Sequence, residues 1–112
     1  MLPNPYILSL AELLEKIKLC IKDGSNMSHA GYDTPAMMRA MLDIHIHWLA
    51  LNDLNGLDTL KIEFLPTGSL QEHSVSNGWG KEYLQFASEF DKLYDILSKT
   101  ATPQRTQGGR EE

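Results

Sequence analysis

Apolar side chains recur at intervals of three and four residues near the start of the chain, which is the period of an amphipathic helix. Their positions are Leu10, Leu13, Leu14, Ile17 and Ile21. Ser9 and Glu12 have the spacing of a capping box, so we expect the helix to begin at Leu10. Gly24 follows the run, and glycine readily adopts the left-handed conformation that ends a helix. The pattern predicts a helix over residues 10–22.

A second helical pattern follows a stretch of turn-forming residues at 24–33, which we expect to be a loop. Thr34 and Pro35 favour a helix start, because threonine caps an N-terminus and proline fits the first turn. The apolar positions of this helix are Met37, Met38, Met41, Leu42, His45, Trp48 and Leu49. We expect it to end at residues 52–56.

Residues 57–65 fit two patterns, because Leu57, Leu60, Phe64 and Leu65 form a helical stripe whereas Leu60, Ile62 and Phe64 alternate as in a strand. We favour a short helix. Pro66 breaks it, and the run of glycine, asparagine and serine up to Gly80 indicates a long loop.

A last helix is predicted over residues 81–98. Its apolar face consists of Tyr83, Phe86, Ala87, Phe90, Leu93, Tyr94 and Leu97. Residues 100–112 contain no large apolar side chain, so we expect a disordered tail. The fold class predicted is all-α: one domain over residues 1–99, built as a compact bundle of about four helices with a long loop before the last.

Composition places the chain among globular proteins, with 42% hydrophobic and 22% charged residues. The net charge of −5 lies entirely within residues 1–99, which contain 13 of the 15 acidic and eight of the ten basic residues. An acidic body repels phosphate groups, which argues against nucleic acid and anionic membranes as partners. The same charge permits a basic protein partner.

Cys20 is the single cysteine, so no intrachain disulfide can form and a reducing compartment is expected. No stretch reaches the ~20 apolar residues of a membrane span, and the start of the chain lacks the pattern of a signal peptide. These features predict a cytoplasmic protein.

The histidines are the first candidates for chemistry, because imidazole is a common metal ligand and general base. On a helix, His45 and His47 point in nearly opposite directions, so they do not bind one metal ion from the same turn. We expect His45 to pack in the core, and His47 to pair with Asp43 or face water. His29, His73 and Cys20 show no spacing that indicates a nucleophile or a metal site. We therefore expect no catalytic residue, metal or cofactor, and an enzyme or metalloprotein is the least favoured alternative.

Trp79 allows two interpretations, since it lies between two glycines in the predicted loop. It folds back onto the last helix near Tyr83, or it is an exposed anchor for a partner, because interface hot spots are rich in tryptophan. Several acidic side chains lie near it or off the apolar stripe of the last helix. The predicted partner-binding residues are Glu72, Trp79, Glu82, Glu89 and Asp95.

Several short pieces of the chain occur in a characteristic order. They are Leu-Asn-Asp-Leu-Asn-Gly-Leu at 51–57, Gly-Ser-Leu at 68–70, Asn-Gly-Trp at 77–79 and Leu-Tyr at 93–94. In this order they resemble a family of small bacterial proteins of unknown function, similar to the immunity proteins of polymorphic toxin systems. The resemblance spans residues 7–98 and carries over no catalytic residue.

The functional prediction is a non-enzymatic, cytoplasmic immunity protein that binds and neutralises a cognate bacterial toxin, which would be a basic domain. The alternative is a small homo-oligomeric helical protein with a structural or regulatory role. In that alternative Met37, Met38 and Met41 form a self-association face, since methionine side chains adapt to many partners. Core filling by these methionines is the simpler explanation of their spacing.

Overall fold

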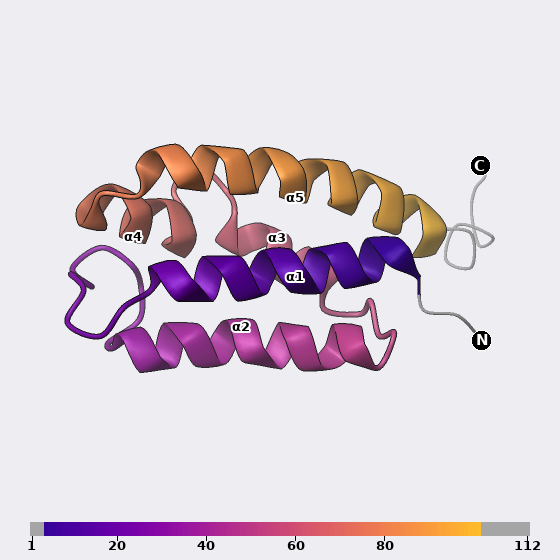
Figure 1. Ribbon diagram of the computed structural model, residues 1–112, viewed down its shortest axis with the longest axis horizontal. Helices are drawn as coiled ribbons and strands as arrows, with labels where there is room; N and C mark the ends of the chain where they lie inside the picture. Colours follow the sequence, from indigo (N-terminus) through magenta and orange to yellow (C-terminus); the bar gives the residue numbers. More distant parts are fainter. Residues whose placement is uncertain (1–3, 102–112) are drawn as a thin grey trace.

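The structure is a computed structural model that describes residues 4–101 (Figure 1). These residues form five helices and no strand, so the all-α prediction is confirmed. The helices are α1 (Pro5–Cys20), α2 (Pro35–Ala50), α3 (Leu57–Glu63), α4 (Ser69–Asn77) and α5 (Gly80–Ala101). The predicted tail lies outside the described residues except for its first two, which continue α5. None of the helices over residues 4–101 combines the length and apolar character of a membrane span.

Helix α1 lies between α2 and α5 and contacts both of them (Figure 1). Helices α3 and α4 form a second layer, in which both pack against α5. Because α1 is covered on two sides, the apolar residues that point to those sides are almost completely buried. They are Ile7, Leu10, Leu13, Leu14 and Ile17, and the loop residue Ile21 joins them.

The beginning of α1 differs from the prediction. The helix begins at Pro5, and the Asn4 side-chain oxygen accepts a hydrogen bond from the Tyr6 backbone N–H at 2.8 Å. The predicted capping pair Ser9 and Glu12 lies inside the helix, so that prediction was wrong. Asn4 and Pro5 form the same cap-plus-proline signal that Thr34 and Pro35 provide for α2.

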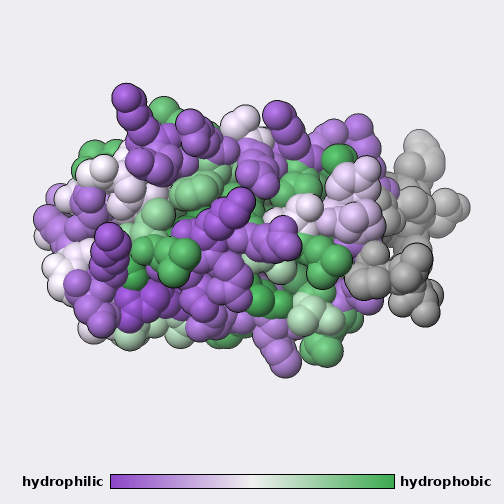
Figure 2. Space-filling view, in the orientation of Figure 1, coloured by the Kyte–Doolittle hydropathy of each residue, from purple (hydrophilic) through white to green (hydrophobic). Residues whose placement is uncertain are grey.

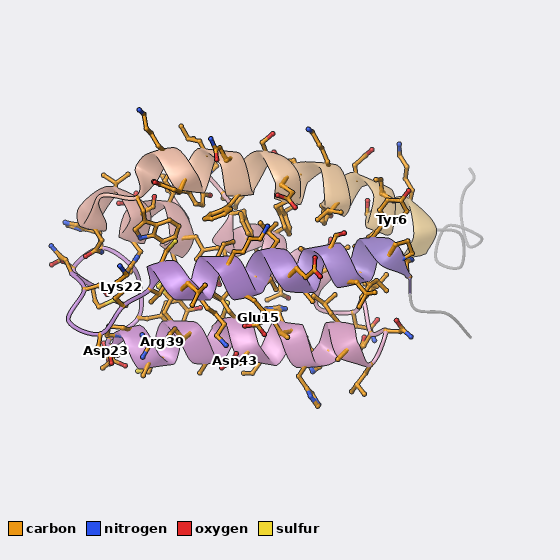
Figure 3. The ribbon with its side chains drawn as sticks, in the orientation of Figure 1. Tyr6, Glu15, Lys22, Asp23, Arg39 and Asp43 are labelled. Carbon is orange, nitrogen blue, oxygen red and sulfur yellow. The ribbon has the colours of Figure 1, made fainter. Side chains whose placement is uncertain are left out.

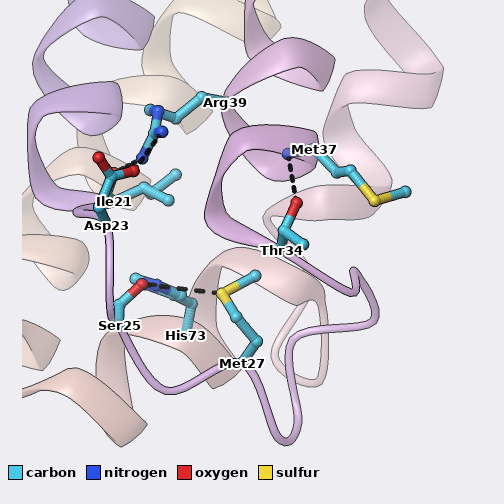
Figure 4. Close-up of polar contacts among 8 residues, drawn as sticks. All are labelled: Ile21, Asp23, Ser25, Met27, Thr34, Met37, Arg39 and His73. Carbon is cyan, nitrogen blue, oxygen red and sulfur yellow. Dashed lines mark hydrogen bonds and ion pairs between the residues drawn. The ribbon is translucent and has the colours of Figure 1, made fainter.

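Helices α2 and α3 agree with the sequence pattern. Thr34 caps α2, and its hydroxyl accepts a hydrogen bond from the Met37 N–H at 3.1 Å (Figure 4). Residues 57–63 are helical rather than extended. Phe64, at the end of α3, stacks on Phe90 of α5 with ring centroids 4.1 Å apart and fixes α3 against α5.

The long loop predicted before the last helix is wrong, because residues 69–77 form α4. Its inward side consists of Leu70, His73 and Ser74, which are completely buried. Two of these three are polar, so no apolar stripe signals the helix in the sequence. Gly78 ends α4 with a positive φ of 81°, the left-handed conformation that favours glycine.

Candidate functional site

Helix α2 carries apolar side chains on two faces. One face is buried against the core and consists of Met38, Leu42, His45 and Leu49. The second face, here called the α2 stripe, consists of Met37, Met41, Ile44, Trp48 and the C-cap residue Leu51. Its members are spaced by four, three, four and three residues, which keeps them within roughly 80° of arc on the helix. That spacing is the a/d pattern of a helix–helix seam.

The α2 stripe is largely exposed. Half of the Met37 and Ile44 side chains, 64% of Leu51 and 37% of Trp48 are accessible to solvent. Met41 is partly buried at the edge of the core. Single exposed apolar residues are ordinary, but a row of them along one helix is typical of an interaction surface.

The charged residues of α2 lie away from this stripe, on the side that faces α1 (Figure 3). Asp43 forms an ion pair with Lys18 of α1. Arg39 pairs with Asp23 at 2.7 Å and also donates to the Ile21 carbonyl at 2.6 Å (Figure 4). Helix α2 contains no other Asp, Glu, Lys or Arg residue. The α2 stripe and the flanking Ala36 and Ala40 therefore contain no Asp, Glu, Lys or Arg side chain.

Trp48 is held in place from beneath. A Cβ atom on Gly56 would lie 2.5 Å from carbon atoms of the indole, so the ring rests directly on the glycine backbone. The His45 ring meets the indole edge-on, with centroids 5.2 Å apart. One side of the indole is thus fixed while the other reaches solvent, an arrangement suited to a preorganised aromatic contact.

A second cluster of interest joins the α1–α2 loop to α4 and α5. The indole N–H of Trp79 donates to Nδ1 of His73 at 3.0 Å, and Nε2 of His73 lies 2.9 Å from the Ser25 hydroxyl. Asn77 adds hydrogen bonds to both backbone groups of Asn26, at 2.7 and 2.8 Å. The cluster ties the loop to the end of α4.

The Ser25–His73 pair has the wrong proton arrangement for a nucleophile and its base. Because the indole N–H can only donate, Nδ1 of His73 must accept, and the neutral ring carries its proton on Nε2. Nε2–H then donates to Ser25, whose hydroxyl points to the sulfur of Met27 at 3.7 Å (Figure 4). Burial also lowers the pKa of His73. The geometry suits a structural clamp rather than acid–base catalysis.

Cys20 lies beside a surface pocket of about 480 Å³. Trp79 and Glu82 also line this pocket, together with Lys22 and Asp23. The pKa of the half-buried thiol is raised, chiefly by burial and further by the Glu82 carboxylate. A protonated thiol is a poor nucleophile and a poor metal ligand, so the pocket offers no activated group there.

The remaining histidines are separated. His45 is buried, and burial lowers its pKa, whereas His47 and His29 are exposed. Within residues 4–101, no three His, Cys, Asp or Glu side chains are grouped closely enough to hold a metal ion.

The structure separates the predicted partner-binding residues. Trp79 is 7% exposed and its ring packs near Tyr83 and Phe86, so the folded-back interpretation describes it better than the exposed anchor. Glu72 is half-buried in the first turn of α4. Glu82 is exposed at the start of α5, beside the Cys20 pocket.

The other two predicted acids lie farther along α5. Glu89 follows Glu82 by two helical turns and shares its side of the helix, whereas Asp95 is rotated roughly 120° away from Glu89. Asp95 forms an ion pair with Lys99 at 3.2 Å. Lysines at 81, 92 and 99 alternate with the acids, and Figure 2 shows hydrophilic side chains along the α5 edge with isolated hydrophobic ones between them. The outer side of α5 is a mixed-charge surface rather than an acidic one.

The sequence pattern does not predict two groups of these residues. His73 lies in a predicted loop, although Ser69 followed by Glu72 three residues later is a helix-start signature. Ile44 and Leu51 of the α2 stripe lie outside the predicted apolar face of the helix, although they are spaced at helical intervals from Met37 and Trp48.

No family model, no curated protein and no solved structure matches this chain. The resemblance to immunity proteins therefore stays a prediction.

Proposed function

We propose that the protein is a non-enzymatic binding protein that contacts another protein through the α2 stripe. The observation that carries this proposal is the exposed apolar row Met37, Ile44, Trp48 and Leu51 on a helix whose charges are both engaged with the α1 side. Burying such a row removes apolar area from water, which is the main favourable term in protein association. None of these four side chains is charged, so their burial carries no cost of removing a charge from water.

The test compares Ile44→Asp with the matched control Leu84→Asp, since Leu84 is an exposed leucine on the outer side of α5. Sedimentation velocity is measured for each protein alone and mixed with the product of the neighbouring upstream gene. We expect Ile44→Asp to abolish whichever complex forms and Leu84→Asp to leave it intact. A complex equally tolerant of both substitutions would refute the α2 stripe as the contact surface.

A second candidate is the immunity function, in which the protein captures a basic toxin domain. The net charge of −5 supports it, because an acidic protein attracts a basic one and accelerates their encounter. Glu82 and Glu89 on one side of α5 are the acids best placed to contribute. The association rate with the purified toxin domain is expected to fall as salt rises from about 50 to 500 mM, because screening shortens the range of the attraction. A rate indifferent to salt argues against it.

A further inference from the structure

We propose that the protein bound at the α2 stripe inserts an arginine side chain into a pocket between Trp48 and Asp53. This inference rests on the proposed role of the stripe and adds the chemistry of its partner, which is an apolar segment with an arginine at one end. Three observations carry it: the pocket, the carboxylate that lines it and the local imbalance of charge.

The pocket lies where the indole of Trp48 meets the turn that leads from the end of α2 back toward α3 (Figure 1). Its volume is about 240 Å³, and its lining residues are Trp48, Asp53, Asn55, Gly56 and Thr59. The indole is held in place there, because it rests on the Gly56 backbone. The pocket thus combines a fixed aromatic ring with polar groups, which suits a side chain with an apolar stem and a charged end.

Asp53 is the one charged residue among those five, and its side chain is half-buried. Its Oδ1 accepts a hydrogen bond from the backbone N–H of Asn55 at 2.9 Å, which fixes the carboxylate within the turn. Among residues 4–101 this carboxylate has no ion-pair partner and accepts no second hydrogen bond. An ionised carboxylate has about four acceptor positions, so most of them are open to a bound cation.

The chain around the pocket is rich in negative charge. Residues 40–60 contain three aspartates and no lysine or arginine. Asp43 is engaged in an ion pair with α1, and Asp58 accepts a hydrogen bond from the Tyr94 hydroxyl at 2.6 Å. Asp53 also lies just beyond the C-terminal end of α2, where the helix dipole is negative. A partner that brings a positive charge to this point is complementary to the local potential.

An arginine suits this pocket better than a lysine. The planar guanidinium packs against aromatic rings and can form two parallel hydrogen bonds to a carboxylate, whereas an ammonium is compact and strongly hydrated. Asn55 and Thr59 also carry side-chain oxygens, which are acceptors for further guanidinium N–H groups. Apolar side chains of the same partner segment would cover the adjoining Ile44 and Leu51 of the α2 stripe.

The first measurement is an NMR titration of the ¹⁵N-labelled chain with N-acetyl-arginine amide. The chain has two tryptophans, so the indole N–H of Trp48 reports on the pocket and that of the buried Trp79 is an internal control. We expect a saturable shift of the Trp48 signal with a dissociation constant in the millimolar range, because one exposed ion pair contributes little. The Trp79 signal should not move.

Two further probes test the chemistry of the ligand. N-acetyl-citrulline amide has nearly the same shape as the arginine probe without its charge, so it should leave the Trp48 signal unchanged. N-acetyl-lysine amide should bind more weakly than the arginine probe. A Trp48 signal that does not respond to the arginine probe, or that responds equally to the citrulline or the lysine probe, would overturn the inference.

Asp53→Asn tests the carboxylate, because asparagine keeps an oxygen for the Asn55 N–H and removes only the charge. This variant should bind the arginine probe about fivefold more weakly. Glu89→Gln is the matched control, since it removes one exposed carboxylate from the outer side of α5 and should leave the affinity unchanged. Full affinity in Asp53→Asn would show that the pocket does not recognise a cation through this group.

The inference and the proposed function fail in different ways. If Ile44→Asp abolishes the complex with the partner protein while Asp53→Asn and Glu89→Gln both leave it intact, the α2 stripe is a contact surface and the arginine pocket is wrong. If the arginine probe binds as expected but the complex tolerates Ile44→Asp, the pocket binds arginine and the proposed contact surface is wrong.

Discussion

His73 shows how one side chain links three segments of the chain. Its ring is completely buried, accepts from the Trp79 indole and donates to the Ser25 hydroxyl. A protonated imidazole has two N–H donors and no acceptor, so it cannot receive the indole N–H. Protonation therefore breaks one hydrogen bond and places a charge in a buried site, and burial accordingly lowers the pKa of the ring.

This residue predicts how stability depends on pH. The pKa of His73 is lower in the folded protein than the ~6.5 of an unfolded chain, so below about pH 6.5 the unfolded state binds more protons. The contribution of the neutral His73 ring to the free energy of unfolding is therefore complete above that pH. This contribution is lost as the pH drops toward the pKa of the folded state. His45, whose pKa is also lowered by burial, acts in the same direction. Each contributes at most about 1.4 kcal/mol per pH unit.

Urea unfolding at pH 7.5 and pH 5.5 measures this effect. The parent chain should be less stable at pH 5.5, and His73→Gln should lose part of that difference because it removes one titrating group. Leu84→Gln, which changes an exposed residue and removes no titrating group, should keep the full difference. An unchanged difference in His73→Gln would show that the buried ring does not titrate in this range.

Gly56 gives a prediction based on close contact. A methyl group at this position would lie 2.5 Å from the Trp48 ring, so Gly56→Ala must displace the indole or the backbone and should destabilise the protein by about 1–3 kcal/mol. Gly80→Ala is the matched control, because no atom lies within 4 Å of its added methyl group and alanine favours a helix. Chemical denaturation of the two variants compares them directly, and equal midpoints would contradict the close contact of Trp48.

At the scale of whole elements, apolar periodicity predicts α1, α2, α3 and α5 because each buries a stripe of aliphatic or aromatic side chains. It misses α4, since the inward positions of that helix are His73 and Ser74 as well as Leu70. Those polar groups are buried at little cost because each has a hydrogen-bond partner. The spacing of apolar residues in the sequence does not reveal such hydrogen bonds. Trp79 could not be placed from sequence for a related reason. Its indole N–H donates to His73, and the sequence pattern predicts a loop at that residue.

The candidate site was less predictable than the fold. The methionines of α2 were recognised from sequence, but a helix with two apolar stripes can bury either one. In the structure the stripe with Met38, Leu42 and Leu49 is buried, and the ion pairs Lys18–Asp43 and Asp23–Arg39 accompany this orientation of α2. Such pairings between distant segments are not visible in local spacing.

The α3–α5 contact gives the prediction at this scale. Phe90 is completely buried and stacks on Phe64, so Phe90→Ala should leave a cavity and destabilise the protein by about 3–5 kcal/mol. Leu84→Ala changes an exposed residue of the same helix and should stay within about 0.5 kcal/mol of the parent. Denaturant unfolding of both variants would contradict the assigned core if their midpoints coincided.

The whole molecule has two unlike sides. The α5 side carries alternating acids and lysines, whereas the α2 stripe on the other side of α1 is uncharged and apolar. A partner bound at the α2 stripe would cover the apolar side and leave the mixed-charge side exposed. The net charge of −5 would then still favour solubility and attract a basic protein over a longer range.

The homo-oligomeric alternative predicts that thermal stability depends on protein concentration. A dimer that forms from folded chains stabilises the folded state by mass action, so in this alternative the melting temperature of the parent chain should rise as its concentration increases from about 5 to 500 µM. Ile44→Asp places a charge in the α2 stripe and should melt at a temperature independent of concentration. Leu84→Asp should keep the concentration dependence. Differential scanning calorimetry measures all three, and a parent chain whose melting temperature stays constant over this range would leave the homo-oligomeric alternative without support.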